Sequence, residues 1–233
     1  MPITDKDFER IISDKDQRIN TFQPIVKDNN IKMFTVIPSV MGSNVYELPL
    51  SERSIYLYEL RTLIDSLSII EKHSDNSFFV ELTLSESTVL NGLFIKFLLS
   101  KVSLTPAISR IVLNVFDDFC SASEKEKVIN QLNDFKRIGY QVMFTSSKKG
   151  ISYMFLGSPM DFLKVNLSTC STKMKKIFIS FFLDQGKDTT FIFSGIDTLE
   201  DYCLAESVGA KYLQGKYLGE GKPILMSGRY SIS

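Results

Sequence analysis

The stretch FIFSGIDTLEDYCLAESVGAKYLQGKYLG, Phe191–Gly219, decides the fold of this 233-residue chain. It opens with the short apolar run Phe191–Phe193, which is typical of a buried strand. About twenty residues later Lys211–Gln214 has the length and composition of a second short strand, and Gly215 closes it. A strand, a crossover helix and a strand at this spacing predict a βαβ unit, which builds a parallel sheet.

The segment between these two strands has the signals of a helix. Thr198 with Asp201 three residues later is typical of a helix start. Gly209 is the residue type that commonly follows a helix end, because it tolerates a left-handed backbone. The apolar residues expected to form one inward stripe are Leu199, Tyr202, Cys203, Ala205 and Val208.

The rest of the chain continues this alternation. Thr21–Val26 and Ile31–Ile37 flank a turn at 27–30, so they are predicted to form an antiparallel hairpin. Further strands are expected at Ser77–Leu84, Ile108–Phe116, Tyr140–Thr145, Asp161–Val165 and Thr189–Phe193, and helices at Ser51–His73, Thr88–Ser100, Glu124–Ile138, Ile151–Leu156 and Ser171–Leu183. Such alternation without a linker predicts one α/β barrel over residues 21–233. Residues 1–20 are expected to form a charged helix outside it, and 221–233 a terminal strand or tail.

Composition excludes several classes of function. The 27 basic and 27 acidic residues cancel and form no basic block, so no direct nucleic-acid partner is expected. No run approaches the length of a membrane span, and the charged N-terminus lacks a signal-peptide pattern. Cys120, Cys170 and Cys203 have no metal-ligand spacing, and the single histidine, His73, cannot build a histidine metal site. We therefore expect a cytoplasmic protein.

Several motifs resemble a known family. Ser194–Thr198 reads SGIDT, and Ala205–Gly219 reads AESVGAKYLQGKYLG. Together with Gln23–Val26 (QPIV), these resemble the EAL domain, the bacterial cyclic-di-GMP phosphodiesterase family, over roughly Gln23 to Gly219. The resemblance implies a (β/α)8 TIM-like barrel with one antiparallel strand from the N-terminal hairpin. It also implies an ancestral site in which carboxylates at the barrel mouth hold two divalent metals that activate water.

When the family pattern is aligned with this sequence, most of the positions that hold metal ligands in the family carry other residues. Thr35 and Asn114 stand where the family has metal-binding glutamates, and Glu81 stands where it has an asparagine. Ser39 takes the place of the phosphate-binding arginine, and Thr145 with Ser146 the place of two aspartates. Ser194 replaces the glutamate of the last motif. The family residues that this sequence retains are Gln23, Lys164, Asp197 and Gln214.

The resemblance therefore implies a barrel with no catalytic residues, no bound metal and no cofactor. Asp117 and Asp118 could be metal ligands, but carboxylates between a strand and a helix are more often N-terminal caps or helix-dipole partners. Lys148 and Lys149 could bind phosphate, but adjacent lysines rarely face the same way, so an exposed loop is the preferred interpretation.

Stand-alone degenerate EAL proteins of enteric bacteria are similar in type, and one of them binds FlhD and keeps the flagellar master regulator FlhD/FlhC off DNA. That resemblance implies a motility repressor that acts by protein–protein binding, with FlhD as first candidate partner. The alternative is a receptor that binds cyclic-di-GMP without cleaving it. This is less favoured, because Ser39 removes the phosphate-binding arginine and the bridging metals have lost their ligands. Little or no cyclic-di-GMP binding is expected.

Overall fold

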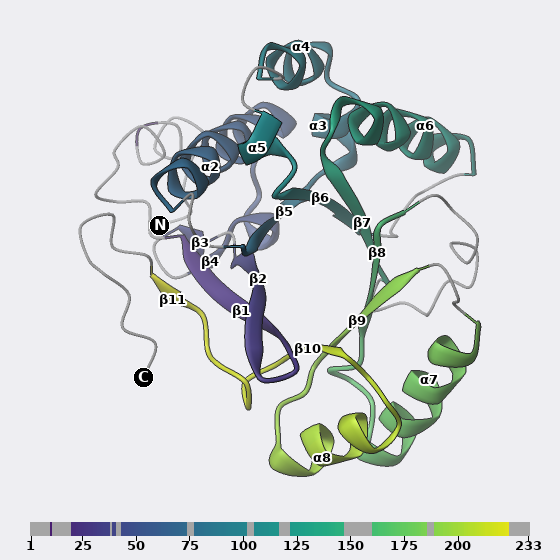
Figure 1. Ribbon diagram of the computed structural model, residues 1–233. Helices are drawn as coiled ribbons and strands as arrows, with labels where there is room; N and C mark the ends of the chain where they lie inside the picture. The colour runs from purple at the N-terminus through teal and green to yellow at the C-terminus, as the bar shows by residue number, and fades with distance from the viewer. Residues whose placement is uncertain are drawn as a thin grey trace.

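A computed structural model describes residues 10, 20–37, 39–40, 43–73, 77–101, 105–116, 122–146, 160–185 and 189–223. Eight strands form a closed barrel, seen along its axis in Figure 1. They are β1 (Thr21–Lys27), β2 (Asn30–Ile37), β5 (Phe79–Leu84), β6 (Ile111–Phe116), β7 (Gln141–Thr145), β8 (Phe162–Asn166), β9 (Thr190–Ser194) and β10 (Tyr212–Gln214). The charged helix expected over residues 1–20 lies outside the described residues, apart from Arg10 and Asn20.

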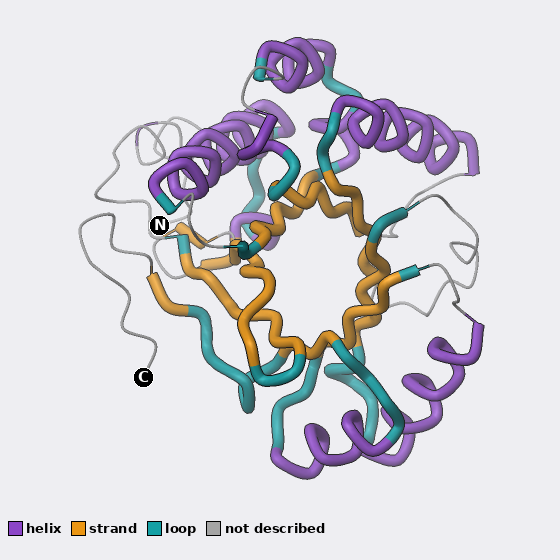
Figure 2. The backbone as a smooth tube through the Cα atoms, viewed as in Figure 1, coloured by secondary structure: helices purple, strands orange, loops and turns teal. Residues whose placement is uncertain are grey.

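Helices lie outside the ring of strands, as Figure 2 shows. They are α2 (Glu52–Lys72), α3 (Glu86–Val89), α4 (Gly92–Ser100), α5 (Thr105–Ile108), α6 (Ala122–Ile138), α7 (Thr172–Gln185) and α8 (Leu199–Ser207). Short pieces complete the description: β3 (Ser39–Val40), β4 (Ser43–Asn44), the 3₁₀ helix η1 (Val45–Glu47) and β11 (Lys222–Pro223). None of the helices described here is both long and apolar enough to span a membrane.

The barrel is mixed because β1 runs against its neighbours. β1 pairs antiparallel with β2 and with β10, and the other barrel pairings are parallel. The turn between β1 and β2 places Asp28 and Asn29 at φ values of 49° and 60°. Aspartate and asparagine tolerate this left-handed region better than most residues, and two such residues in succession are typical of a tight hairpin. The expected antiparallel strand and the α/β barrel are both confirmed.

Most predicted elements are present with small shifts at their ends. The helix expected over Thr88–Ser100 is two helices, α3 and α4, because Asn91 caps a new start by accepting from the amides of Leu93 and Phe94. The strand expected from Ile108 begins at Ile111, after the short helix α5. The helix expected at Ile151–Leu156 lies outside the described residues.

Helix α8 matches the expected apolar stripe in part. Ala205 is buried, and Tyr202 and Val208 pack against the core. Leu199, however, is 57% exposed and Cys203 is exposed, and the polar residue Asp201 is buried. Asp201 Oδ2 lies 2.7 Å from Lys175 Nζ of α7, whose side chain is buried as well. The expected stripe is therefore wrong for Leu199 and Cys203, and it missed the ion pair that places Asp201 inward. The predicted Thr198 cap is correct, since its hydroxyl accepts from the Asp201 amide at 3.1 Å.

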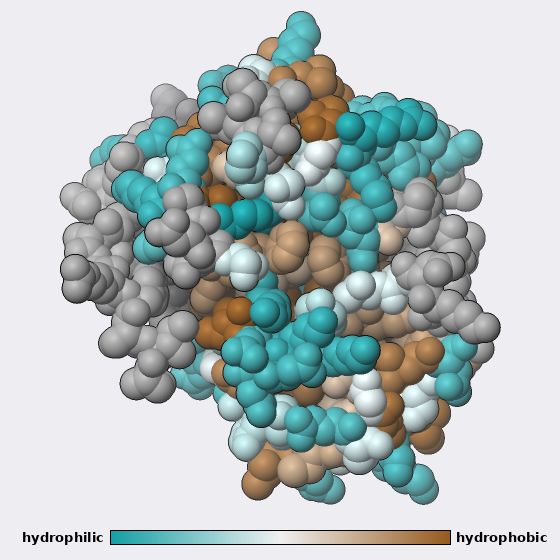
Figure 3. Space-filling model, viewed as in Figure 1, coloured by the Kyte–Doolittle hydropathy of each residue, from teal (hydrophilic) through white to brown (hydrophobic). Residues whose placement is uncertain are grey.

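Because side chains alternate along each strand, the barrel has an outer apolar layer under the helices and an inner apolar layer. Residues that point outward, such as Leu82, Val115 and Phe144, pack against the helices in the main core. Residues that point inward form an apolar layer made of Ile25, Met33, Val112, Met143, Phe162 and Ile192, with Phe79 and Tyr212 at its edge. Figure 3 shows apolar atoms at the centre of the ring, surrounded by hydrophilic side chains. The barrel is a packed core and not a pore.

Candidate functional site at the barrel mouth

A second, polar layer lies above the apolar one, at the carboxyl ends of the parallel strands. Because side chains alternate along a strand, a residue two positions beyond an inward apolar residue also points inward. In β6, for example, Val112 is followed by Asn114, and in β8 Phe162 is followed by Lys164. The residues at this level are Thr35, Glu81, Asn114, Thr145, Lys164, Ser194 and Gln214. They come from seven different strands, so only barrel closure brings them together.

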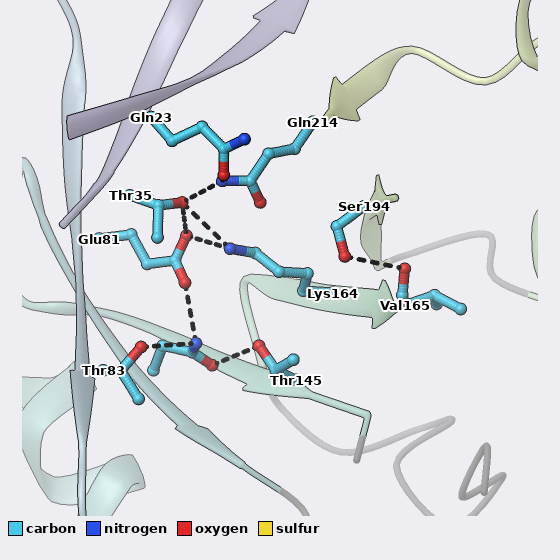
Figure 4. Close-up of polar contacts among 10 residues, drawn as sticks. Gln23, Thr35, Glu81, Thr83, Thr145, Lys164, Val165, Ser194 and Gln214 are labelled. Atoms are coloured by element: carbon cyan, nitrogen blue, oxygen red, sulfur yellow. Dashed lines mark hydrogen bonds and ion pairs between the residues drawn. The ribbon is translucent and has the colours of Figure 1, made fainter. Parts of the chain in front are cut away.

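Glu81 is at the centre of the resulting network, which Figure 4 shows. Its Oε2 accepts from Lys164 Nζ in a short contact and from the Thr35 hydroxyl at 2.6 Å. Its Oε1 accepts from Asn114 Nδ2 at 2.8 Å. The Thr145 hydroxyl donates to Asn114 Oδ1 at 2.9 Å. Both oxygens of the only carboxylate in the network therefore have partners within the protein.

The network continues across the barrel to β10 and β1. Gln214 Nε2 donates to the Thr35 hydroxyl at 2.8 Å and to Gln23 Oε1 at 3.1 Å. Gln23 Nε2 in turn donates to the Gly219 carbonyl at 3.4 Å. These amides are neutral donors, so they add orientation to the network without adding charge.

Lys164 and Glu81 form a buried ion pair. Their side chains are 6% and 1% exposed, respectively. Burial lowers the pKa of Lys164 below its ordinary value, and the neighbouring Glu81 carboxylate opposes this shift. The opposite charge of Glu81 in direct contact favours the ionised form of Lys164. The pair thus brings a cation into the mouth and balances the charge of Glu81 without any ion from solvent.

The described part of the mouth does not fit a pair of divalent cations. Such ions need several hard oxygen ligands, mostly carboxylates. Here Glu81 is the single carboxylate, and the Lys164 ammonium already contacts it and would repel a dication. No group of three histidine, cysteine, aspartate or glutamate residues that could hold a metal occurs among the residues described. We therefore derive no metal-dependent step for this site.

Solved structures that resemble this barrel include EAL domains. An EAL domain protein from Listeria monocytogenes matches with a TM-score of 0.72 at 17% identity over 96% of each chain. The Bacillus subtilis YkuI protein, solved with its substrate c-di-GMP and calcium, gives 0.76 at 14% identity over 95% of this chain and 59% of that one. The FimX EAL domain of Xanthomonas citri, in complex with c-di-GMP, gives 0.71 at 11% identity over 97% and 96%.

The fold is that of an EAL domain. No protein-family model matches the sequence, and no curated protein is similar to it in sequence. At these identities the structural likeness establishes the EAL fold and leaves the chemistry to be argued from the site.

Within this EAL fold, other expected site residues lie at the mouth but outside the network. Ser194 Oγ donates to the Val165 carbonyl at 3.4 Å. The Ser146 hydroxyl accepts from the Asn166 amide at 3.0 Å, so it supports the backbone. Asp197 is exposed and accepts from the Lys216 amide at 3.0 Å. Ser39 lies in β3, which pairs with β4. None of these residues is among the hydrogen-bond partners found for Glu81 in the described part of the chain.

Some expectations fall on residues that are not described, and some contacts were not anticipated. Asp117, Asp118, Cys120, Lys148 and Lys149 lie outside the described residues.

Sequence reasoning missed Thr83, whose hydroxyl is 3.5 Å from Asn114 Nδ2. It also treated Glu81 and Lys164 as separate remnants. Their opposite charges, on inward positions at the same level of the barrel, were the signal that could have identified the pair.

Proposed function

We propose that this chain is a catalytically inactive EAL-fold protein of the cytoplasm that acts by binding another protein. The observation that carries the proposal is the occupied mouth, where the Glu81 carboxylate is neutralised by Lys164 and hydrogen-bonded by Thr35 and Asn114. A phosphodiesterase site needs free carboxylates to hold its metals and cationic groups to meet its phosphates. Among the described residues of the mouth network, the one acid and the one lysine are paired with each other.

The outer surface supports recognition of a protein. Exposed large apolar side chains occur on α4, α7 and α8, where Leu93 is 65%, Ile177 52% and Leu199 57% exposed. Protein interfaces bury apolar side chains at their centre and leave polar ones at the rim. Since the net charge is zero, long-range electrostatic steering contributes little to association.

The first test concerns catalysis and nucleotide binding. The purified protein should show no turnover of cyclic-di-GMP in Mg²⁺ or Mn²⁺, and no tight binding by calorimetry, because Lys164 is already paired and the amides of Gln23 and Gln214 are neutral. An active EAL phosphodiesterase in the same buffers is the control. Metal-dependent hydrolysis that disappears in a folded Glu81→Gln variant would overturn the proposal. A micromolar dissociation constant without hydrolysis would favour a cyclic-di-GMP receptor.

The second test concerns the partner. We propose FlhD as the first candidate, on the resemblance of the SGIDT and LQG motifs to degenerate EAL proteins of that type. The chain should co-purify with FlhD with an affinity on the order of 1 µM or tighter, as stable interfaces of standard size do. It should also displace FlhD/FlhC from promoter DNA and reduce swimming when overproduced. FlhC alone serves as the negative control. If neither a complex nor a loss of swimming is seen, the flagellar assignment is wrong.

A further inference from the structure

Glu59 is a second buried carboxylate, away from the Glu81 network. It lies on α2, is 1% exposed, and reaches the segment that follows β5. Its Oε1 accepts from the Ser85 amide at 2.8 Å, and its Oε2 accepts from the Ser85 hydroxyl at 3.1 Å. In contrast to Glu81, Glu59 has no cationic partner within the described part of the chain. A buried carboxylate without a cation is costly in its ionised form.

The contacts of Tyr46 indicate which form is present. The Tyr46 hydroxyl, from η1, lies 2.8 Å from Glu59 Oε1 and 2.8 Å from the Thr83 carbonyl. A phenol has one proton to donate, and an ionised carboxylate and a carbonyl are both acceptors only. Both short contacts become hydrogen bonds if the Glu59 carboxyl carries a proton and donates to Tyr46, which then donates to Thr83. The arrangement therefore satisfies all three groups when Glu59 is neutral.

We propose that neutral Glu59 is a pH-sensitive latch that holds the η1 segment against the end of β5 and loosens when Glu59 loses its proton above neutral pH. Ionisation leaves Tyr46 between two acceptors, so one of its two contacts is lost. A small cavity of about 10 Å³, lined by residues that include Tyr46, Glu59 and Thr62, lies next to the carboxyl group. This is about the space that one water molecule needs, so the ionised group can be hydrated there.

The surroundings of Glu59 agree with this assignment. Burial raises the pKa of Glu59 to about 7, and hydrogen bonds from Thr88, Tyr46 and Ser85 oppose the shift. Burial, and then Glu59, raise the pKa of Tyr46 well above its ordinary value, so Tyr46 keeps its proton. Tyr46 from η1 and Tyr58 from α2 are the titratable groups that line the same cavity. On the side of β5 and α3, Glu59 is hydrogen-bonded by the amide and hydroxyl of Ser85 and by the Thr88 side chain, and none of these groups is charged.

The latch touches the mouth network through one residue. Thr83 accepts from Tyr46 with its carbonyl oxygen, and its hydroxyl lies 3.5 Å from Asn114 Nδ2, which donates to Glu81. A change at Glu59 therefore acts on the backbone of β5 next to the buried ion pair. This gives the rim of the barrel a response to pH that does not depend on a bound nucleotide.

The direct test is an NMR titration of the Glu59 side-chain carboxyl group, with exchange of the Leu48 amide as second readout. The Leu48 amide donates to the Val45 carbonyl at 3.2 Å and so reports on the η1 segment. We expect a midpoint near 7 and a loss of Leu48 protection, corrected for intrinsic exchange, of about tenfold between pH 5.5 and 8.5. A group whose pKa is raised by folding adds stability below its unfolded pKa, and this stability is lost as pH rises through the folded value. Relative to Glu59→Gln, the Tm of the wild type should fall by about 5 °C over this range.

Three variants make the result interpretable. Glu59→Gln keeps a donor and an acceptor at all pH values, so its Leu48 protection should not change with pH. Tyr46→Phe should lower that protection at every pH, because the link to Thr83 is gone. Glu47→Gln, an exposed change on the same η1 segment, should keep the wild-type profile. A Glu59 midpoint near the ordinary glutamate value, or equal pH profiles in wild type and Glu59→Gln, would exclude the latch.

Discussion

Replacing Lys164 by methionine should lower the free energy of unfolding by about 3–5 kcal/mol, because Glu81 is left as a buried charge without its cation. The Glu81 side chain is 1% exposed, so water cannot replace the lost partner. Its hydrogen bonds from Thr35 and Asn114 remain, but these neutral donors offset only part of the cost. Urea denaturation followed by circular dichroism measures the effect.

The double variant Lys164→Met with Glu81→Gln tests whether the loss of stability comes from breaking the ion pair or from losing Lys164 itself. With both charges gone, a buried ion pair is often replaced at little cost, so the double variant should lie within about 2 kcal/mol of the wild type. Arg137→Met is the matched control, because Arg137 and Asp134 form an ion pair at 2.9 Å with side chains 79% and 55% exposed. That exposed pair should contribute about 1 kcal/mol or less. An equal loss in Lys164→Met and Arg137→Met would contradict the buried-pair interpretation.

Gly215→Ala should destabilise the barrel by about 3 kcal/mol or more, in the range of severe overpacking. A Cβ on Gly215 would lie 2.0 Å from the Ile196 carbonyl oxygen and 2.5 Å from the Ile196 nitrogen. Both are backbone atoms, so no side-chain rotation relieves the contact. The same backbone holds the loop after β9, since the Ile196 amide donates to the Gln214 carbonyl at 3.0 Å. Separation of these segments would also displace Gln214 from Thr35 in the mouth.

Gly92→Ala is the control for this substitution. Gly92 is the first residue of α4, and a Cβ there would have no atom within 4 Å. Alanine should therefore change stability by about 1 kcal/mol or less. The thermal unfolding midpoint and soluble yield of the two variants give the comparison. Similar midpoints for Gly215→Ala and Gly92→Ala would show that the backbone around Ile196 can adjust, and the predicted clash would be wrong.

The predictions for Lys164 and Gly215 concern the stability of the barrel mouth, which has to be distinguished from any chemical role of the residues there. Lys164 and Gln214 are residues that the EAL resemblance associates with a nucleotide site, yet in this structure both are hydrogen-bonded to other parts of the barrel. Loss of activity in a variant of such a residue is therefore informative only if its stability is measured as well. For this reason, the hydrolysis test requires that the Glu81→Gln variant be folded.

Local sequence signals were sufficient for the order and type of most elements. The apolar run of β9, the Thr198 cap and the glycine after α8 each act within a few residues, so they could be interpreted from the chain alone. The hairpin of β1 and β2 was likewise predictable from Asp28 and Asn29. Interpretation failed where a distant residue decided the packing. On helix α8 the inward position of Asp201 was missed, because it depends on the contact with Lys175 of α7.

The sequence by itself determined that the mouth carries few acidic groups, because residue types at strand ends are visible without coordinates. Only the tertiary structure decided what those groups do. Glu81 and Lys164 are 83 positions apart, and their contact exists because barrel closure places β5 and β8 side chains at the same level of one interior. The physical reason is that strand alternation fixes which side a residue faces, while its partner across the barrel depends on the register of every strand between them.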